Sequence, residues 1–142
     1  MKPILLGADH AGFKLKERIK EELERRKIPF QDLSPTFKEG DDYPRIGMRI
    51  ARKLKQLGGH AVLVCGSGVG MAIAANRIKG VRAVLGHNAK EVERARIDDD
   101  VNLLALSGWK TSMPMAMGMI TKLLKTKASS AARHRRRVKQ LG

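Results

Sequence analysis

Short apolar segments alternate with amphipathic helical segments along this chain, and that alternation constrains the fold more than any other feature. In the segment 12–27, for example, Leu15, Ile19 and Leu23 recur every four residues among charged ones, which is typical of a helix with one buried face. Strands are predicted at residues 2–8, 28–33, 61–64, 80–85 and 101–106, and helices at 12–27, 42–57, 71–77, 88–96 and 112–125. This order predicts an α/β fold with an open, doubly wound sheet of five parallel strands and helices on both faces.

The length and composition predict one soluble domain. A chain of 142 residues with 42% hydrophobic residues is long enough for one core and short for two. We expect the domain to span residues 1–128, followed by a basic helical tail at 129–142. One cysteine excludes an internal disulfide, and the chain shows neither a signal peptide nor a long apolar run. We therefore expect a cytoplasmic protein without contact with a membrane.

Positive charge is concentrated toward the C-terminus. The net charge is +15, and beyond Asp100 the chain has nine Lys or Arg residues and no Asp or Glu. Such an end favours an anionic partner, either a phosphorylated metabolite, a nucleic acid or an acidic protein. The chain has few aromatic residues that could stack on bases and no nucleic-acid-binding motif, so nucleic acid is not the expected partner.

The only cysteine, Cys65, ends the third predicted strand and opens the glycine-rich sequence of residues 66–70. The spacing of this turn is GxGxG, which matches neither a dinucleotide fingerprint nor a Walker loop. A turn of this kind before a helix gathers backbone N–H groups, which can hold an anion and favour a thiolate. The alternatives are a buried structural cysteine and a tight turn without a ligand.

Two other groups of residues are candidates for binding. Asp9 and His10 follow the first predicted strand, at the same sheet edge as the turn after Cys65, and could orient hydroxyl groups or move protons. Asp9 could instead cap the next helix. His134, within the basic run 133–137, could help bind phosphate, although such runs are commonly solvated. No His or Cys pair has metal-ligand spacing, so we expect neither a metal nor a cofactor.

Several motifs, in order, resemble one family. They are Gly7-Ala8-Asp9-His10-Ala11-Gly12, Asp42-Tyr43-Pro44, Cys65-Gly66-Ser67-Gly68-Val69-Gly70, Ala74-Ala75-Asn76-Arg77, Gly80-Val81-Arg82-Ala83, Asn102-Leu103-Leu104-Ala105, and Arg133-His134 with Arg137. Over almost its full length the chain resembles ribose-5-phosphate isomerase B and the related galactose-6-phosphate isomerase subunits. The resemblance implies a three-layer, Rossmann-like homodimer, or a tetramer, that interconverts an aldose phosphate and a ketose phosphate, with ribose 5-phosphate and ribulose 5-phosphate as the first expectation.

The resemblance also implies roles for individual residues. Cys65 would be the base that moves a proton between C1 and C2, and Ser67 with the loop N–H groups would hold the enediolate oxygens. The remaining implied ligand contacts are Asp9, His10, Tyr43, Gly66, Gly68, Val69, Gly70, Asp99, Lys110, Arg133, His134 and Arg137. Arg133 and Arg137 match phosphate-binding positions. Because active sites in this family combine two subunits, the tail 129–142 would complete the site of the partner subunit.

The chain departs from the family pattern at two positions. Asp98 stands where many relatives have a histidine credited with opening the sugar ring, and we expect it to take part in catalysis. Trp109 stands where relatives often have a phosphate-binding arginine, and Lys110 beside it is a candidate replacement for the charge. Two alternatives therefore stay open. One is an isomerase of a six-carbon substrate such as galactose or allose 6-phosphate, and the other is a non-catalytic member that binds sugar phosphate or nucleic acid.

Overall fold

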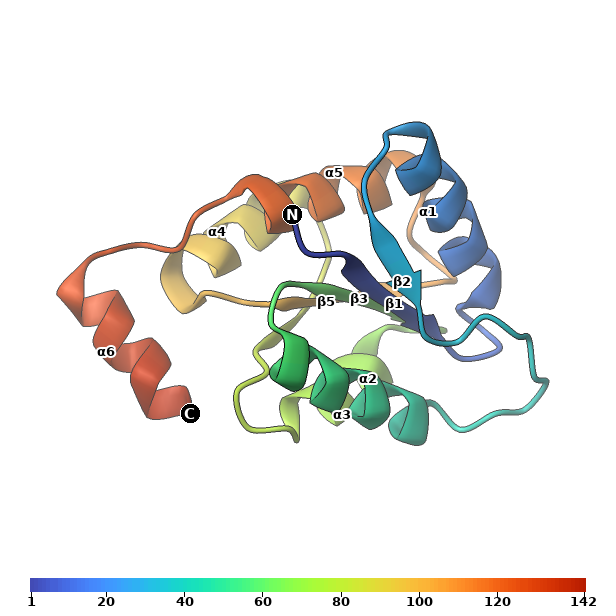
Figure 1. The fold of residues 1–142 in the computed structure, drawn as a ribbon, viewed down its shortest axis with the longest axis horizontal. Coiled ribbons are helices and arrows are strands. Elements are labelled where there is room, and N and C mark those ends of the chain that lie inside the picture. Colours follow the sequence, from blue (N-terminus) through green and yellow to red (C-terminus); the bar gives the residue numbers. More distant parts are fainter.

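The computed structural model describes residues 1–142, and its centre is a five-stranded, all-parallel sheet (Figure 1). The strand order is β2-β1-β3-β5-β4. In chain order the elements are β1 (Ile4–Ala8), α1 (Phe13–Arg25), β2 (Phe30–Asp32), α2 (Tyr43–Leu57), β3 (Ala61–Cys65), α3 (Val69–Asn76), β4 (Ala83–Leu85), α4 (Ala89–Asp99), β5 (Leu103–Ser107), α5 (Met113–Lys125) and α6 (Ala132–Leu141). The predicted doubly wound α/β fold is confirmed.

Helices cover both faces of the sheet, which gives three layers. Figure 1 shows α1, α4 and α5 on one face and α2 and α3 on the other. The chain runs from β1 outward to β2 and then returns to place β3 on the other side of β1. Such a reversal leaves a crevice at the carboxyl ends of the two strands, where open α/β sheets bind ligands.

The strand residues alternate between two cores. Ile4 and Leu6 of β1 belong to the core under α1, α4 and α5, which contains 17 buried residues. Leu5 belongs to the smaller core of 12 buried residues under α2 and α3, together with Cys65 of β3. Because successive side chains of a strand point to opposite faces, both faces of a central parallel strand must be apolar.

One predicted boundary differs in a way that matters for function. Helix α4 was predicted to end near Arg96 but continues to Asp99, so Asp98 and Asp99 are helical rather than part of a loop. The Arg96 side chain is buried and donates hydrogen bonds to the backbone carbonyl of Val101 at 2.7 Å and to the Asp100 carboxylate at 2.7 Å. These bonds tie the last turn of the helix to the segment that follows it.

A charged side chain is buried between α1 and β2. The side chain of Lys16 is only 1% exposed, and its Nζ donates to Asp32 Oδ2 at 2.8 Å and to the carbonyl oxygen of Ser34 at 2.6 Å. Lys20 adds a second ion pair to the same Asp32 oxygen at 2.9 Å. Buried ammonium groups are tolerated only when they are paired in this way.

The two helical layers differ in charge. Helix α2 carries five Lys or Arg residues and no acidic one, and α3 carries no charge. In the whole stretch 43–90, which includes both helices, there is no Asp or Glu. Acidic residues lie instead on α1 and α4, in the opposite layer. The layer of α2 and α3 therefore carries positive charge, all of it on α2, and no negative charge.

Helix α6 lies apart from the other layers, at the β4 edge of the sheet (Figure 1). It has no buried residue and packs on α4. Its end reaches the connection between α3 and β4, where Gly142 lies next to Lys79. No helix has both the length and the apolar composition that crossing a bilayer requires.

Candidate active site

A pocket of about 400 Å³ opens at the carboxyl ends of β1 and β3, at the predicted crevice. It contains Cys65 at its wall and most of the residues that the sequence singled out. The residues that line it are Asp9, His10, Ala11, Tyr43, Cys65, Gly66, Ser67, Val69, Gly70, Ile73 and Trp109. Residues from four separate parts of the chain therefore meet around the single thiol.

The thiol of Cys65 is held by the turn that follows it. The N–H of Gly68 donates a hydrogen bond to Cys65 Sγ at 3.2 Å. Gly68 has a φ of +82°, a left-handed conformation that glycine adopts without strain, and α3 begins at the next residue. The sulfur thus faces an N–H donor at the N-terminal end of a helix.

Two glycines of the loop after Cys65 lie directly against aromatic rings that line the pocket. A Cβ on Gly66 would lie 2.3 Å from the ring of Trp109, and a Cβ on Gly70 would lie 2.4 Å from the ring of Tyr43. Side chains at these positions would therefore displace the aromatic rings. Between these walls Ser67 is exposed, and its Oγ accepts the N–H of Val69 at 3.2 Å, so its hydroxyl proton is free for a ligand.

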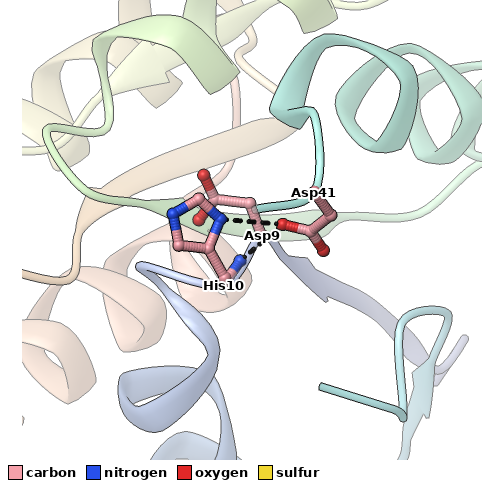
Figure 2. Close-up of side chains that lie close together, drawn as sticks. All are labelled: Asp9, His10 and Asp41. Atoms are coloured by element: carbon pink, nitrogen blue, oxygen red, sulfur yellow. Dashed lines mark hydrogen bonds and ion pairs between the residues drawn. The ribbon is translucent and has the colours of Figure 1, made fainter. Parts of the chain in front are cut away.

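Asp9 and His10 lie beside the thiol, and a third residue, Asp41, joins them (Figure 2). Asp9 is buried, and its Oδ1 accepts the N–H of Gly12 at 2.9 Å. Burial raises the pKa of Asp9, although the hydrogen bond from Gly12 opposes that shift. Asp41 Oδ1 accepts the backbone N–H of His10 at 2.7 Å and lies 3.0 Å from His10 Nδ1. This contact raises the pKa of His10.

Asp9, His10 and Asp41 are also the one group of side chains that could share a metal ion. One ligand atom from each lies within 4.8 Å of the others. However, the Asp41 oxygen is already engaged by two His10 nitrogens, and Asp9 Oδ1 by Gly12. These hydrogen bonds account for the cluster without an ion.

Of the two residues after β5 that the sequence singled out, Trp109 lines the pocket and Lys110 does not. The Trp109 side chain forms part of its wall, although it is 72% exposed overall, whereas Lys110 is not among the lining residues. Hydrogen bonds fix this turn to the cysteine loop, because Gly108 N–H donates to the Cys65 carbonyl at 2.7 Å and Ser107 Oγ donates to the Gly66 carbonyl at 2.7 Å. Lys110 follows this turn, outside the pocket.

The other predicted site residues lie at the opposite edge of the sheet. Asp98 and Asp99 end α4 and precede β5, whose Leu103 pairs with the first residue of β3 while its Ser107 pairs with Cys65. Within one chain, Asp98 and Asp99 are therefore separated from the thiol by the length of the sheet. Arg133, His134 and Arg137 lie on α6, which likewise does not reach the pocket.

Asp98 and His134 meet in a second cavity, of about 740 Å³, between α4 and α6. His134 Nε2 lies 3.6 Å from Asp98 Oδ1, and Arg94 binds the other Asp98 oxygen at 2.8 Å. His134 Nδ1 and Asp98 Oδ1 are buried without a hydrogen-bond partner in this chain. Buried polar atoms of this kind are rare in folded proteins, so these two are suited to receive a further group.

The pocket around Cys65 has no lysine or arginine among its 11 lining residues. It therefore offers a base, N–H donors, the His10 imidazole and aromatic walls, but neither a guanidinium nor an ammonium group that could bind a phosphate. Sequence reasoning found most of the lining but missed Asp41, for which the only signal is its place directly before the Asp42-Tyr43-Pro44 motif.

Comparisons with known proteins agree with these features. Residues 4–141 match the family described as Ribose/Galactose Isomerase. A probable ribose-5-phosphate isomerase B of Mycoplasma genitalium is 34% identical, and the match covers 97% of this chain and 92% of that protein. The crystal structure of ribose 5-phosphate isomerase from Thermotoga maritima superposes with a TM-score of 0.92 at 32% identity, covering 98% of this chain and 96% of that one. The crystal structure of ribose-5-phosphate isomerase B from Mycoplasma genitalium with bound ribulose-5-phosphate superposes with a TM-score of 0.88 at 34% identity. The match covers 98% of this chain and 93% of that one. The chain belongs to the ribose/galactose isomerase family.

Proposed function

We propose that this protein is an aldose–ketose isomerase that interconverts ribose 5-phosphate and ribulose 5-phosphate through an enediolate. The observation that carries the proposal is the Cys65 thiol, which faces the pocket and accepts the Gly68 N–H at 3.2 Å. Membership of the ribose/galactose isomerase family, and the ribulose-5-phosphate bound to a relative of 34% identity, support this substrate.

The chemistry follows from this arrangement. With the aldose in its open form, the Cys65 thiolate takes the proton from C2, and the electron pair of that bond forms the C1=C2 double bond of the enediolate. Negative charge develops on O1, where the loop N–H groups and the Ser67 hydroxyl stabilise it; each such donor contributes about 3–4 kcal/mol in well-studied enzymes. The thiol then returns its proton to C1, and transfer of the O2 proton to O1 completes the ketose, with a carbonyl at C2 and a hydroxyl at C1. We assign the contacts to O1 to the loop residues Gly66, Val69 and Gly70, while Gly68 holds the sulfur and Tyr43 forms a wall of the pocket.

We further propose that a second copy of the chain supplies the phosphate anchor. The pocket contains no lysine or arginine, whereas Arg133 and Arg137 lie on a helix with no buried residue that is remote from the thiol of its own chain. In a two-fold dimer each subunit can place its tail across the partner's pocket. The cavity that contains Asp98 and His134, with Asp99 close by, would then face the Cys65 pocket of the partner. Lys110, next to Trp109, is a candidate additional cation.

A mixing experiment tests the shared site. We expect Cys65→Ala and Arg137→Ala to be inactive or nearly so on their own. When the two variants are unfolded together and refolded, half of the dimers carry both chains, and one site of each such dimer has neither substitution. Activity should therefore recover to about a quarter of the wild-type value. Activity can recover in this way only if each site combines residues of two chains. Refolded mixtures that contain verified mixed dimers but show no recovered activity would contradict the proposal.

A substrate panel tests the function and the choice of sugar. We expect the wild-type protein to isomerise ribose 5-phosphate with a kcat/KM at least about tenfold above its values for galactose 6-phosphate and allose 6-phosphate, because one misplaced substrate group commonly costs about 1–3 kcal/mol. Isomerisation would be followed by NMR from either side of the equilibrium. Higher activity on a six-carbon substrate would reassign the sugar. Binding without turnover on every sugar would contradict an isomerase and favour a sugar-phosphate-binding protein.

A further inference from the structure

His10 is held in one orientation by Asp41. A single oxygen of Asp41 accepts the backbone N–H of His10 at 2.7 Å and lies 3.0 Å from its ring Nδ1. Asp41 belongs to the loop before α2, 31 residues away in the sequence, so the contact joins this loop to the turn after β1. Figure 2 shows the second ring nitrogen, Nε2, facing away from Asp41.

This contact also determines where His10 carries its protons. Because a carboxylate can only accept, Nδ1 must be the protonated nitrogen, whether the ring is neutral or charged. Nε2 is left as the nitrogen that can exchange a proton with a ligand in the pocket. The negative charge of Asp41, and that of Asp9 nearby, favour the form in which Nε2 also carries a proton.

The proposed substrate needs such a proton before the thiol can act. Ribose 5-phosphate exists mainly as a ring in which O4 is bonded to C1, and only the open aldehyde has the acidic C2 proton that Cys65 removes. Opening the ring requires a proton for O4 and loss of the proton on O1. Within this chain Asp98 is at the far edge of the sheet. In the proposed dimer the partner's Asp98 would reach this pocket with its carboxylate already engaged by Arg94 at 2.8 Å, so it is poorly placed as a proton donor.

We propose, on the basis of the proposed function, that His10 is the acid that opens the sugar ring and that Asp41 is the residue that positions it. The Nε2 proton passes to O4 as the C1–O4 bond breaks, and that bond's electron pair stays on O4. The O1 proton passes to the Asp9 carboxylate, and the electrons of the O1–H bond form the C1=O carbonyl. Transfer of this proton from Asp9 back to His10 restores both groups, and ring closure follows the same steps in reverse.

The proposal predicts a specific pH dependence. The titratable groups around His10 are Asp9 after β1, Asp41 in the loop before α2, Tyr43 at the start of α2, and Cys65 at the end of β3. His10 works as an acid only while Nε2 is protonated, so ring opening is lost as the pH rises through the pKa of His10. Asp41 raises that pKa, so removing the charge of Asp41 should move the alkaline limb of the pH–rate profile for ribose 5-phosphate to lower pH.

Asp41→Asn is the decisive variant, because it keeps an oxygen for the two His10 nitrogens but removes the charge. Glu39→Gln is the matched control, since Glu39 is an exposed acid of the same loop whose side chain makes no hydrogen bond or ion pair. Each variant is assayed in two reactions. The first is turnover of ribose 5-phosphate. The second is exchange of the C1 hydrogen of ribulose 5-phosphate with deuterium oxide, followed by NMR, which needs no ring opening because a ketose phosphorylated at O5 cannot form a five-membered ring.

For Asp41→Asn we expect turnover of ribose 5-phosphate to fall at least about tenfold on the alkaline side of the pH–rate profile. The rate of hydrogen exchange at C1 of ribulose 5-phosphate should stay within about twofold of the wild-type rate. His10→Asn should lower turnover of ribose 5-phosphate by about 10²-fold, and its pH–rate profile should lack the alkaline limb that His10 produces in the wild type. Glu39→Gln should behave as wild type. Equal losses in both reactions, or an unshifted alkaline limb, would overturn the role of His10 and Asp41. Wild-type protein that fails in both reactions would instead contradict the proposed function.

Discussion

Cys65→Ala is expected to lower kcat for ribose 5-phosphate by about 10³-fold, because a positioned general base commonly contributes about 10²–10⁴-fold to a proton-transfer step. No other group in the pocket is placed as Cys65 is, at the end of β3 with an N–H donor on its sulfur. Exchange of the C1 hydrogen of ribulose 5-phosphate should fall equally, since that reaction uses the same base. Both rates are measured at saturating substrate.

Binding and folding should survive this substitution. Alanine fits the strand, and the groups proposed to bind the phosphate lie elsewhere, so the dissociation constant for ribulose 5-phosphate should change little. Because the chain has one cysteine, alkylation with iodoacetamide gives an independent check: loss of activity should follow modification of one thiol per chain, and bound ribulose 5-phosphate should slow it. A folded alanine variant that retains wild-type turnover would exclude the thiol as the base.

Asp32→Ala is expected to lower the free energy of unfolding by about 3–5 kcal/mol, which is the usual cost of leaving one member of a buried ion pair without its partner. The side chain of Lys16 is 1% exposed, and Asp32 is its closest carboxylate, at 2.8 Å. Urea unfolding at neutral pH, followed by circular dichroism, measures the loss. Glu24→Gln, which removes an exposed acid of α1, is the matched control and should change stability little.

Two further measurements distinguish the loss of the buried ion pair from a general destabilisation by the substitution at Asp32. Lys16→Met combined with Asp32→Ala should be more stable than Asp32→Ala alone, because the unpaired ammonium is then gone. Burial acts to raise the pKa of Asp32, but hydrogen bonds from Lys16 and Lys20 outweigh burial and lower it. The contribution of Asp32 is therefore complete at neutral pH and is lost as the pH falls below its ordinary value near about 4. The stability difference between wild type and Asp32→Ala should shrink over that acidic range.

The elements of the fold were predictable because each rests on a local pattern. Leu15, Ile19 and Leu23 lie on one face of α1 and are buried, as their spacing predicted. The glycines after Cys65 marked the turn into α3. The order of the strands was not predictable in the same way, since β5 lies between β3 and β4 for reasons of packing that no short segment encodes.

The site was less predictable where loops and helix ends determine it. Asp41 reaches His10 only because a loop of polar residues folds over the end of β1, and such loops have no periodicity to read. Trp109, rather than Lys110, forms the pocket wall because hydrogen bonds tie its turn to the cysteine loop. Asp98 and Asp99 are helical because Arg96 fixes the end of α4, which the sequence pattern did not reveal.

The absence of acidic residues from α2 and α3 has a consequence for how substrate arrives. Both helices contribute to the pocket, through Tyr43 and through Val69, Gly70 and Ile73. A doubly charged sugar phosphate that diffuses past this face meets an attractive potential over a wide area before it touches any residue of the pocket, and counter-ions weaken that attraction. Capture of substrate therefore depends on ionic strength, whereas the proton transfers inside the pocket, at contact distance, do not.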